Sequence, residues 1–165
     1  MRTVVVIGAV AVTTEHWVEY QPDGTQEEGC RLELRRIEDE PMPVPPPVPR
    51  RDAVHWIVGA HLWRADLFWT VGLTEGFDCA HYHPVFEGPT PCDRVFTGDI
   101  PADPEGWATD RLADIPGMLR EAGHPELADA LDPIVVRQAM PVIVAALRAG
   151  LAYRDPARPA GPPVD

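Results

Sequence analysis

The chain has 165 residues, enough for one domain of ordinary size but too few for two domains that each bury a full core. It contains no lysine, serine or asparagine, which excludes a serine nucleophile, a lysine Schiff base, a Walker-type phosphate loop and asparagine-linked glycosylation. A formal net charge of −12 with scattered arginines argues against nucleic acid or a membrane as partner. We therefore expect a small-molecule ligand or substrate, with the oligomeric state left open.

From residue 3 to residue 37 the sequence is typical of β-structure. Asp23-Gly24 has the residue types of a hairpin turn. The arm that follows alternates charged and apolar residues, as in a strand with one solvated face, and these are Arg31, Leu32, Glu33, Leu34 and Arg35. Although residues 4–12 resemble the apolar centre of a signal peptide, no Ala-x-Ala cleavage site follows them, so we expect a cytoplasmic protein.

Residues 41–49 are rich in proline and predict an extended polyproline connector. A ligand for an aromatic peptide-binding groove is the alternative interpretation of this segment.

A second β block is predicted over residues 54–83, with a turn at 72–76. If residues 71 and 77 flank that turn as partners, Leu67 faces His81 and Ala65 faces His83 across the hairpin. In this register the two histidines share a face with the tryptophans of the block, while Arg64, Asp66 and Tyr82 lie on the other face.

Helix starts are predicted where proline follows a capping residue, at Asp103-Pro104, His124-Pro125 and Asp132-Pro133. In the last helix Pro141 is expected to kink or divide the helix and Gly150 to close it. The expected fold class is α+β, an antiparallel sheet of two hairpin blocks followed by two or three C-terminal helices. Residues 1–151 are expected to form a single domain and residues 152–165 a loose tail.

Metal-ligating residues are concentrated between residues 79 and 87. Cys79, His81 and His83 alternate along a predicted strand, so their side chains point to one face at steps of about 7 Å. Glu87 is the candidate third ligand beside the two histidines, and His61 a possible fourth. Two histidines and a carboxylate suit iron, manganese or catalytic zinc, whereas a set with Cys79 and Cys92 suits structural zinc. His55 is a further candidate ligand.

The spacing His81-x-His83-x-x-x-Glu87 resembles the first metal-binding motif of the cupin superfamily, whose members bind iron, manganese, nickel or zinc. The resemblance implies ligand roles for these three residues. It does not extend to the cupin barrel, because the second cupin motif is missing. More broadly, residues 61–96 contain LWRADLF, AHYHP and PCDRVF, which resemble segments of an uncharacterised family of small proteins from GC-rich bacteria.

Two functions stay open at this point. The first is a small metal-dependent enzyme acting on a small molecule, with a divalent metal (Fe, Mn, Ni or Zn) on His81, His83, Glu87 and His61, assisted by Tyr82, Asp66 and Arg64. The second is a non-catalytic α+β module that binds a small molecule or a protein, in which the histidines are structural. On the other face of the hairpin, Arg64 and Asp66 beside the Tyr82 hydroxyl either anchor a carboxylate or phosphate ligand or take part in a cross-strand salt bridge on a solvated face.

Overall fold

The computed structural model describes residues 2–37, 58–72 and 76–154. Within these residues there are seven strands, β1 (Arg2–Ile7), β2 (Val10–Tyr20), β3 (Gln26–Ile37), β4 (Val58–Thr70), β5 (His81–His83), β6 (Phe86–Glu87) and β7 (Thr90–Pro91). The same residues contain five helices, α1 (Asp99–Ala102), α2 (Pro104–Leu112), α3 (Ile115–Glu121), α4 (Pro125–Ala130) and α5 (Pro133–Ala152). The predicted polyproline segment, His55 and most of the predicted tail lie outside the described residues.

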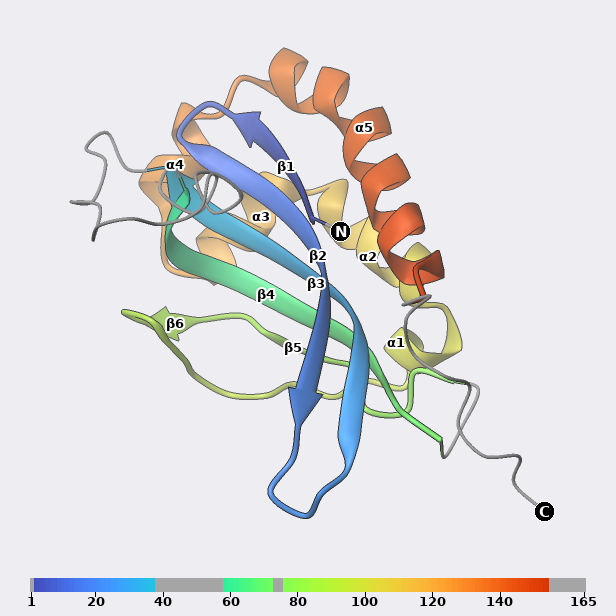
Figure 1. Cartoon of the computed structure of the whole chain (residues 1–165). Coiled ribbons are helices and arrows are strands. Elements are labelled where there is room, and N and C mark those ends of the chain that lie inside the picture. The colour runs from blue at the N-terminus through green and yellow to red at the C-terminus, as the bar shows by residue number, and fades with distance from the viewer. Residues whose placement is uncertain (1, 38–57, 73–75, 155–165) are drawn as a thin grey trace, which may run out of the picture.

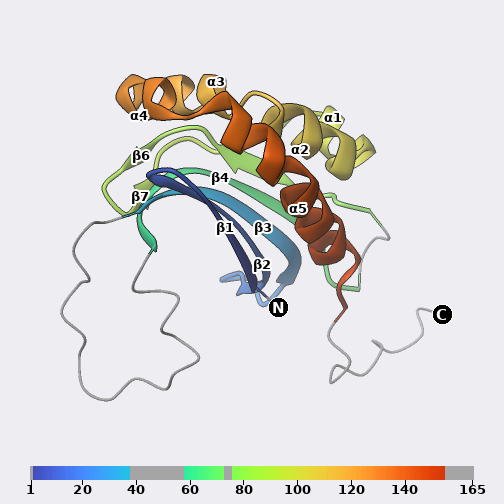
Figure 2. The same ribbon diagram turned by 90° about the horizontal axis from the view of Figure 1, so that it is seen from above.

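Strands β1 to β5 form one antiparallel sheet in the order of the chain, and β6 and β7 form a separate small hairpin (Figure 1). All the helices lie on one face of the five-stranded sheet (Figure 2). The hydrophobic core fills the space between that face and the helices, with Trp63, Leu32 and Ile143 among its fully buried side chains. The α+β class, with the sheet first and the helices after it, is confirmed.

The first hairpin block is confirmed, with one more strand than predicted. Gly24 takes a positive φ of 86° at the turn between β2 and β3, and Asp23 Oδ1 accepts a hydrogen bond from the Thr25 amide. Gly8, with a φ of 63°, divides the predicted first strand into β1 and β2. Glycine adopts this left-handed conformation without the steric penalty of a side chain.

The predicted register of the second hairpin is wrong by one residue. In the structure Asp66 faces His81 and Arg64 faces His83. Residues 77–80 do not continue the strand, because the Asp78 side chain accepts hydrogen bonds from the amide and hydroxyl of Thr70 at the end of β4. A shift of one residue moves every side chain of a strand to the other face. The two histidines therefore lie on the face of Arg64 and Asp66, not on the face of Trp63 and Trp69 of β4.

The three predicted helix starts are confirmed at α2, α4 and α5. The described residues form five helices instead of the two or three expected, since α1 and α3 were not predicted. The proline of α3 follows the Asp114 cap by two residues instead of one. Pro141 lies inside α5 without dividing it. Gly150 does not close this helix either: a Cβ built there would lie 2.6 Å from Cys30 Sγ, so its role is to let α5 approach β3 closely.

Helix α5 is long and apolar enough, by length and composition alone, to cross a membrane. Core helices of soluble proteins meet the same criterion. Val136, Ile143 and Leu147 of α5 are buried against the sheet, whereas Ile134, Val135 and Val142 are exposed, and 28% of the most apolar stretch of the helix is buried.

Candidate metal centre

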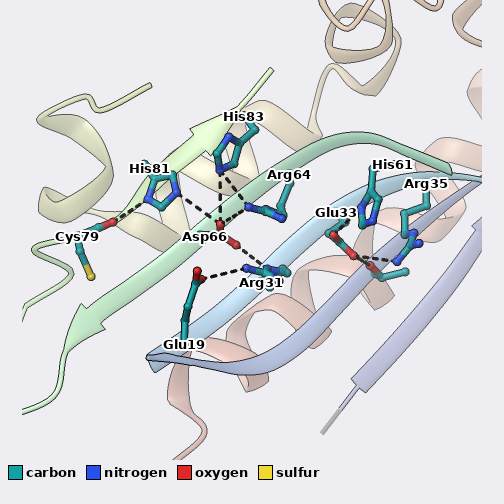
Figure 3. Close-up of polar contacts among 11 residues, drawn as sticks. Glu19, Arg31, Glu33, Arg35, His61, Arg64, Asp66, Cys79, His81 and His83 are labelled. Carbon is teal, nitrogen blue, oxygen red and sulfur yellow. Dashed lines mark hydrogen bonds and ion pairs between the residues drawn. The ribbon is translucent and has the colours of Figure 1, made fainter. Parts of the chain in front are cut away.

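The sheet face opposite the helices carries a cluster of charged side chains that is largely buried. Arg31 and Glu33 on β3, Asp66 on β4, and His81 and His83 on β5 are each less than a tenth exposed. The register brings Arg31 opposite Asp66, and Asp66 opposite His81, so three neighbouring strands meet at one carboxylate. Figure 3 shows this arrangement from above the sheet.

Asp66 lies at the centre of the cluster and is 1% exposed. Arg31 Nε donates a hydrogen bond to Oδ1 at 2.7 Å, and Arg64 Nη2 lies 3.0 Å from Oδ2 (Figure 3). Burial by itself would raise the pKa of Asp66, but the guanidinium groups of Arg31 and Arg64 hold that pKa well below its ordinary range. The carboxylate is therefore ionised at neutral pH.

Both imidazoles are oriented through their Nδ1 atoms. His81 Nδ1 lies 2.9 Å from the carbonyl oxygen of Cys79, and His83 Nδ1 lies 3.1 Å from that of Asp93. A carbonyl oxygen only accepts, so each Nδ1 carries the hydrogen and the neutral ring keeps its lone pair on Nε2. Burial lowers the pKa of His81, which favours this neutral form.

The two Nε2 atoms are directed at the same carboxylate oxygen. His81 Nε2 lies 3.5 Å and His83 Nε2 3.7 Å from Asp66 Oδ2. His81 Nε2 is buried and has no hydrogen-bond partner within the described part of the chain. Two buried acceptors that face each other are unfavourable unless a proton or another cation lies between them. This is the chemical environment of a cation site.

The ligand atoms of Asp66, His81 and His83 lie within 4.8 Å of one another, and the cluster could hold a metal ion. A tetrahedral ion with bonds of about 2.1 Å separates its ligands by roughly 3.4 Å, close to the two imidazole-to-carboxylate distances. Metal-bound histidines almost always donate their second ring hydrogen to a carbonyl or carboxylate, as both imidazoles do here. Three protein ligands leave coordination positions open.

Aromatic rings surround this cluster. The Trp17 ring lies 4.1 Å from the Arg31 guanidinium carbon, and the Phe96 ring lies 5.1 Å from the His81 ring. Phe86 lies beside both Arg64 and His83. Trp17 and Phe96 are 36% and 61% exposed, so an apolar rim borders the polar centre on the solvent side.

A second cluster on the same face is centred on Glu33. His61 Nδ1 lies 3.0 Å from Glu33 Oε1, although the two atoms are not aligned for a hydrogen bond, and Arg35 Nη1 lies 3.5 Å from Oε2. A β-bulge between Leu34 and Arg35 pairs Arg35 with His61. A bulge changes the direction of the side chains that follow it. His61 therefore points to the face of Glu33 and not to the face of Trp63.

The other predicted site residues lie apart from the three converging ligands. Glu87 is exposed on β6, where it pairs with Thr90, and His61 contacts Glu33 and stacks on Phe86. Tyr82 faces the helices, and its hydroxyl accepts a hydrogen bond from Arg111. Arg64 and Asp66, predicted to assist, lie within the cluster itself.

Cys79 and Cys92 contribute backbone carbonyls to this region instead of thiolates. Their carbonyl oxygens lie 2.9 Å from His81 Nδ1 and 3.4 Å from His83 Nδ1. Burial raises the pKa of the Cys79 thiol to about 12, which keeps it protonated and a poor ligand at neutral pH. Asp66 as third ligand could have been found in the sequence only with the correct β4–β5 register.

The Glu33 cluster predicts a defined loss of stability in acid. Burial would raise the pKa of Glu33, but His61, Arg35 and Arg31 hold it below the ordinary value. A carboxyl with a depressed folded-state pKa stabilises the fold above its unfolded pKa, and this contribution is lost as the pH falls through the folded value. We therefore expect Glu33→Gln to flatten the decline in unfolding free energy below about pH 4.5, by up to about 1.4 kcal/mol per pH unit.

Urea unfolding of the wild type and Glu33→Gln at several pH values between 7 and 3 measures this difference. The exposed Glu121, replaced by glutamine, is the matched control and should keep the wild-type slope. Equal slopes for Glu33→Gln and the wild type would show that the Glu33 pKa is not depressed in the folded state.

Comparisons of this chain with protein-family models, with curated proteins and with solved structures found no match.

Proposed function

We propose that this protein is a small metal-dependent enzyme that acts on a small molecule, with its metal ion held by Asp66, His81 and His83. The observation that supports it most is His81 Nε2, which has no hydrogen-bond partner among the described residues and is buried 3.5 Å from an ionised carboxylate oxygen. Compared with the predicted ligand set, Asp66 takes the place of Glu87. Two histidines and one carboxylate with open positions suit non-haem iron, manganese or catalytic zinc.

The residues around the ligands have separate tasks in this proposal. The Cys79 and Asp93 carbonyls fix the two imidazole orientations, and Arg31 orients the carboxylate through Oδ1, leaving Oδ2 toward the histidines. Trp17 and Phe96 limit the access of water to the centre. A bound ion would supply Lewis-acid activation of a substrate or of a water molecule.

A non-catalytic module with structural histidines is the second candidate, and Arg64 favours it. Arg64 Nη2 lies within hydrogen-bonding distance of both Asp66 Oδ2 and His83 Nε2, at 3.0 and 3.1 Å. A guanidinium can thus complete part of this network without a metal.

Metal titration separates the two candidates. We expect protein purified without a histidine tag and stripped with a chelator to bind one equivalent of Fe²⁺, Mn²⁺, Ni²⁺ or Zn²⁺ in isothermal titration calorimetry. At a free metal concentration 100 times Kd, the ion should raise the unfolding free energy by about 2.7 kcal/mol. His81→Ala and His83→Ala should each weaken binding at least about 100-fold, because a ligand is lost.

His124→Ala is the matched control, since this histidine is the N-cap of α4, on the face of the sheet opposite the candidate metal centre, and the substitution should leave metal affinity unchanged. Less than about a tenth of an equivalent bound by the wild type would favour the structural role of the histidines over the enzyme. Unchanged affinity in both His81→Ala and His83→Ala would contradict the proposed ligand set.

A further inference from the structure

Arg64 occupies part of the space that a metal ion bound by Asp66, His81 and His83 would fill. Its Nη2 atom contacts Asp66 Oδ2 and His83 Nε2, which belong to two of the three converging ligands (Figure 3). An ion coordinated by these atoms would use the His83 lone pair and repel the guanidinium. The arginine and the ion therefore exclude each other from this position.

The three carboxylates that contact the arginines of the two clusters, Asp66, Glu19 and Glu33, already have cationic partners. Asp66 Oδ1 accepts a hydrogen bond from Arg31 Nε, and Arg31 Nη2 also lies 3.6 Å from Glu19 Oε2. Glu33, opposite Arg64 across the strands, already contacts His61 and Arg35. The positive charge of a displaced Arg64, together with that of the ion, thus exceeds what these carboxylates neutralise.

The guanidinium is also incompletely bonded in its present position. Arg64 Nε is buried and has no hydrogen-bond partner in the described segments. The arginine side chain is 14% exposed, and its guanidinium carbon lies 5.8 Å from the centre of the Phe86 ring. A planar fork of N–H donors near the aromatic rim matches the oxygens of a carboxylate or phosphate group.

We propose that the substrate of this site is a small anion and that Arg64 binds its carboxylate or phosphate group once a metal ion has displaced the arginine from Asp66 and His83. This inference rests on the proposed function, because it requires the ion. In the metal-free protein the same arginine neutralises Asp66. Arg64 is then a substrate-binding residue, and metal loading precedes binding of the anion.

Anion binding to the metal-loaded protein tests the inference. The probes are malonate for a carboxylate, inorganic phosphate for a phosphate, and malonamide as the neutral analogue. We expect the Zn²⁺- or Mn²⁺-loaded wild type to bind one of the two anions, the metal-free protein to bind neither, and malonamide not to bind. Arg64→Gln should weaken anion binding at least about tenfold, the loss expected for a charge-assisted pair of hydrogen bonds.

Two further variants keep the test decisive. Arg64→Lys retains the charge without the fork and should bind the anion with intermediate affinity, while Arg148→Gln, at an exposed ion pair with Glu105, should match the wild type. In the absence of an anion, Arg64→Gln should bind the metal at least as tightly as the wild type, because a competing cation is gone.

Two results would overturn the inference while leaving the metal site intact. These are equal anion affinity in the wild type and Arg64→Gln, and no anion bound to the metal-loaded wild type. Failure of the wild type to bind metal would instead overturn the proposed function.

Discussion

Replacing Asp66 by alanine should lower the unfolding free energy by about 3–5 kcal/mol, the cost of leaving partners of a buried ion pair without their counter-charge. Arg31 is 8% exposed and the Arg64 side chain 14%, and both contact the Asp66 carboxylate. Without it, two cations remain close together in a poorly solvated site. Urea unfolding in the presence of a chelator measures this effect separately from that of any metal.

Asp129→Ala is the matched control for this measurement. Asp129 also pairs with an arginine, Arg120 at 2.8 Å, but its side chain is 71% exposed. Exposed ion pairs typically contribute about 1 kcal/mol or less, so this variant should remain close to the wild type. If Asp66→Ala costs no more than Asp129→Ala, Asp66 does not anchor the cluster as described.

Asp66→Asn separates the structural role of this residue from its proposed metal-binding role. The amide keeps the shape of the side chain but removes the charge that both arginines face. We expect a smaller loss of stability than for alanine, and at least about 100-fold weaker metal binding, because a neutral amide is a poor substitute for a carboxylate ligand. If Asp66→Asn bound the metal as tightly as the wild type does, Asp66 would not be one of the metal ligands.

The first hairpin and most helix starts were predictable because the signals are local. A turn sequence such as Asp23-Gly24 acts through its own backbone geometry, and Asp103 and Asp132 cap the helices that begin one residue later. The rule that proline directly follows the capping residue missed α3. There the Asp114 side chain accepts a hydrogen bond from the Gly117 amide, but the proline is residue 116, the second residue of the helix. A broader rule, allowing proline in either of the first two helical positions, would have found it.

The composition of the site was not predictable to the same extent, because it depends on the register between strands. Alternation correctly placed His81 and His83 on one face of β5, and Arg64 and Asp66 on one face of β4. Which pairs share a face depends on the connection between the strands, where the Asp78 side chain caps the end of β4. A single-residue difference in register decides whether the histidines are core residues or potential ligands.

The pairing of β3 with β4 holds Arg31 opposite Asp66, and Gly29 is essential to it. Gly29 faces Phe68, and a Cβ built on it would overlap the carbonyl oxygen of Leu67 and lie 2.8 Å from the Cα of Phe68. Both obstacles are backbone atoms in the middle of the sheet, so they cannot move aside without breaking the strand ladder. Gly29→Ala should therefore cost about 3 kcal/mol or more in unfolding free energy.

The same displacement should disturb the candidate metal centre, because Gly29 and Phe68 lie two residues from Arg31 and Asp66 on their strands. We expect weaker metal binding by Gly29→Ala even where the variant is still folded. Gly98→Ala is the control: a Cβ there meets nothing within 4 Å, and its φ of −64° suits any residue, so it should stay within about 0.5 kcal/mol of the wild type. Denaturation midpoints that coincide for Gly29→Ala and the wild type would contradict this close approach, and with it the pairing that places Arg31 on the Asp66 carboxylate.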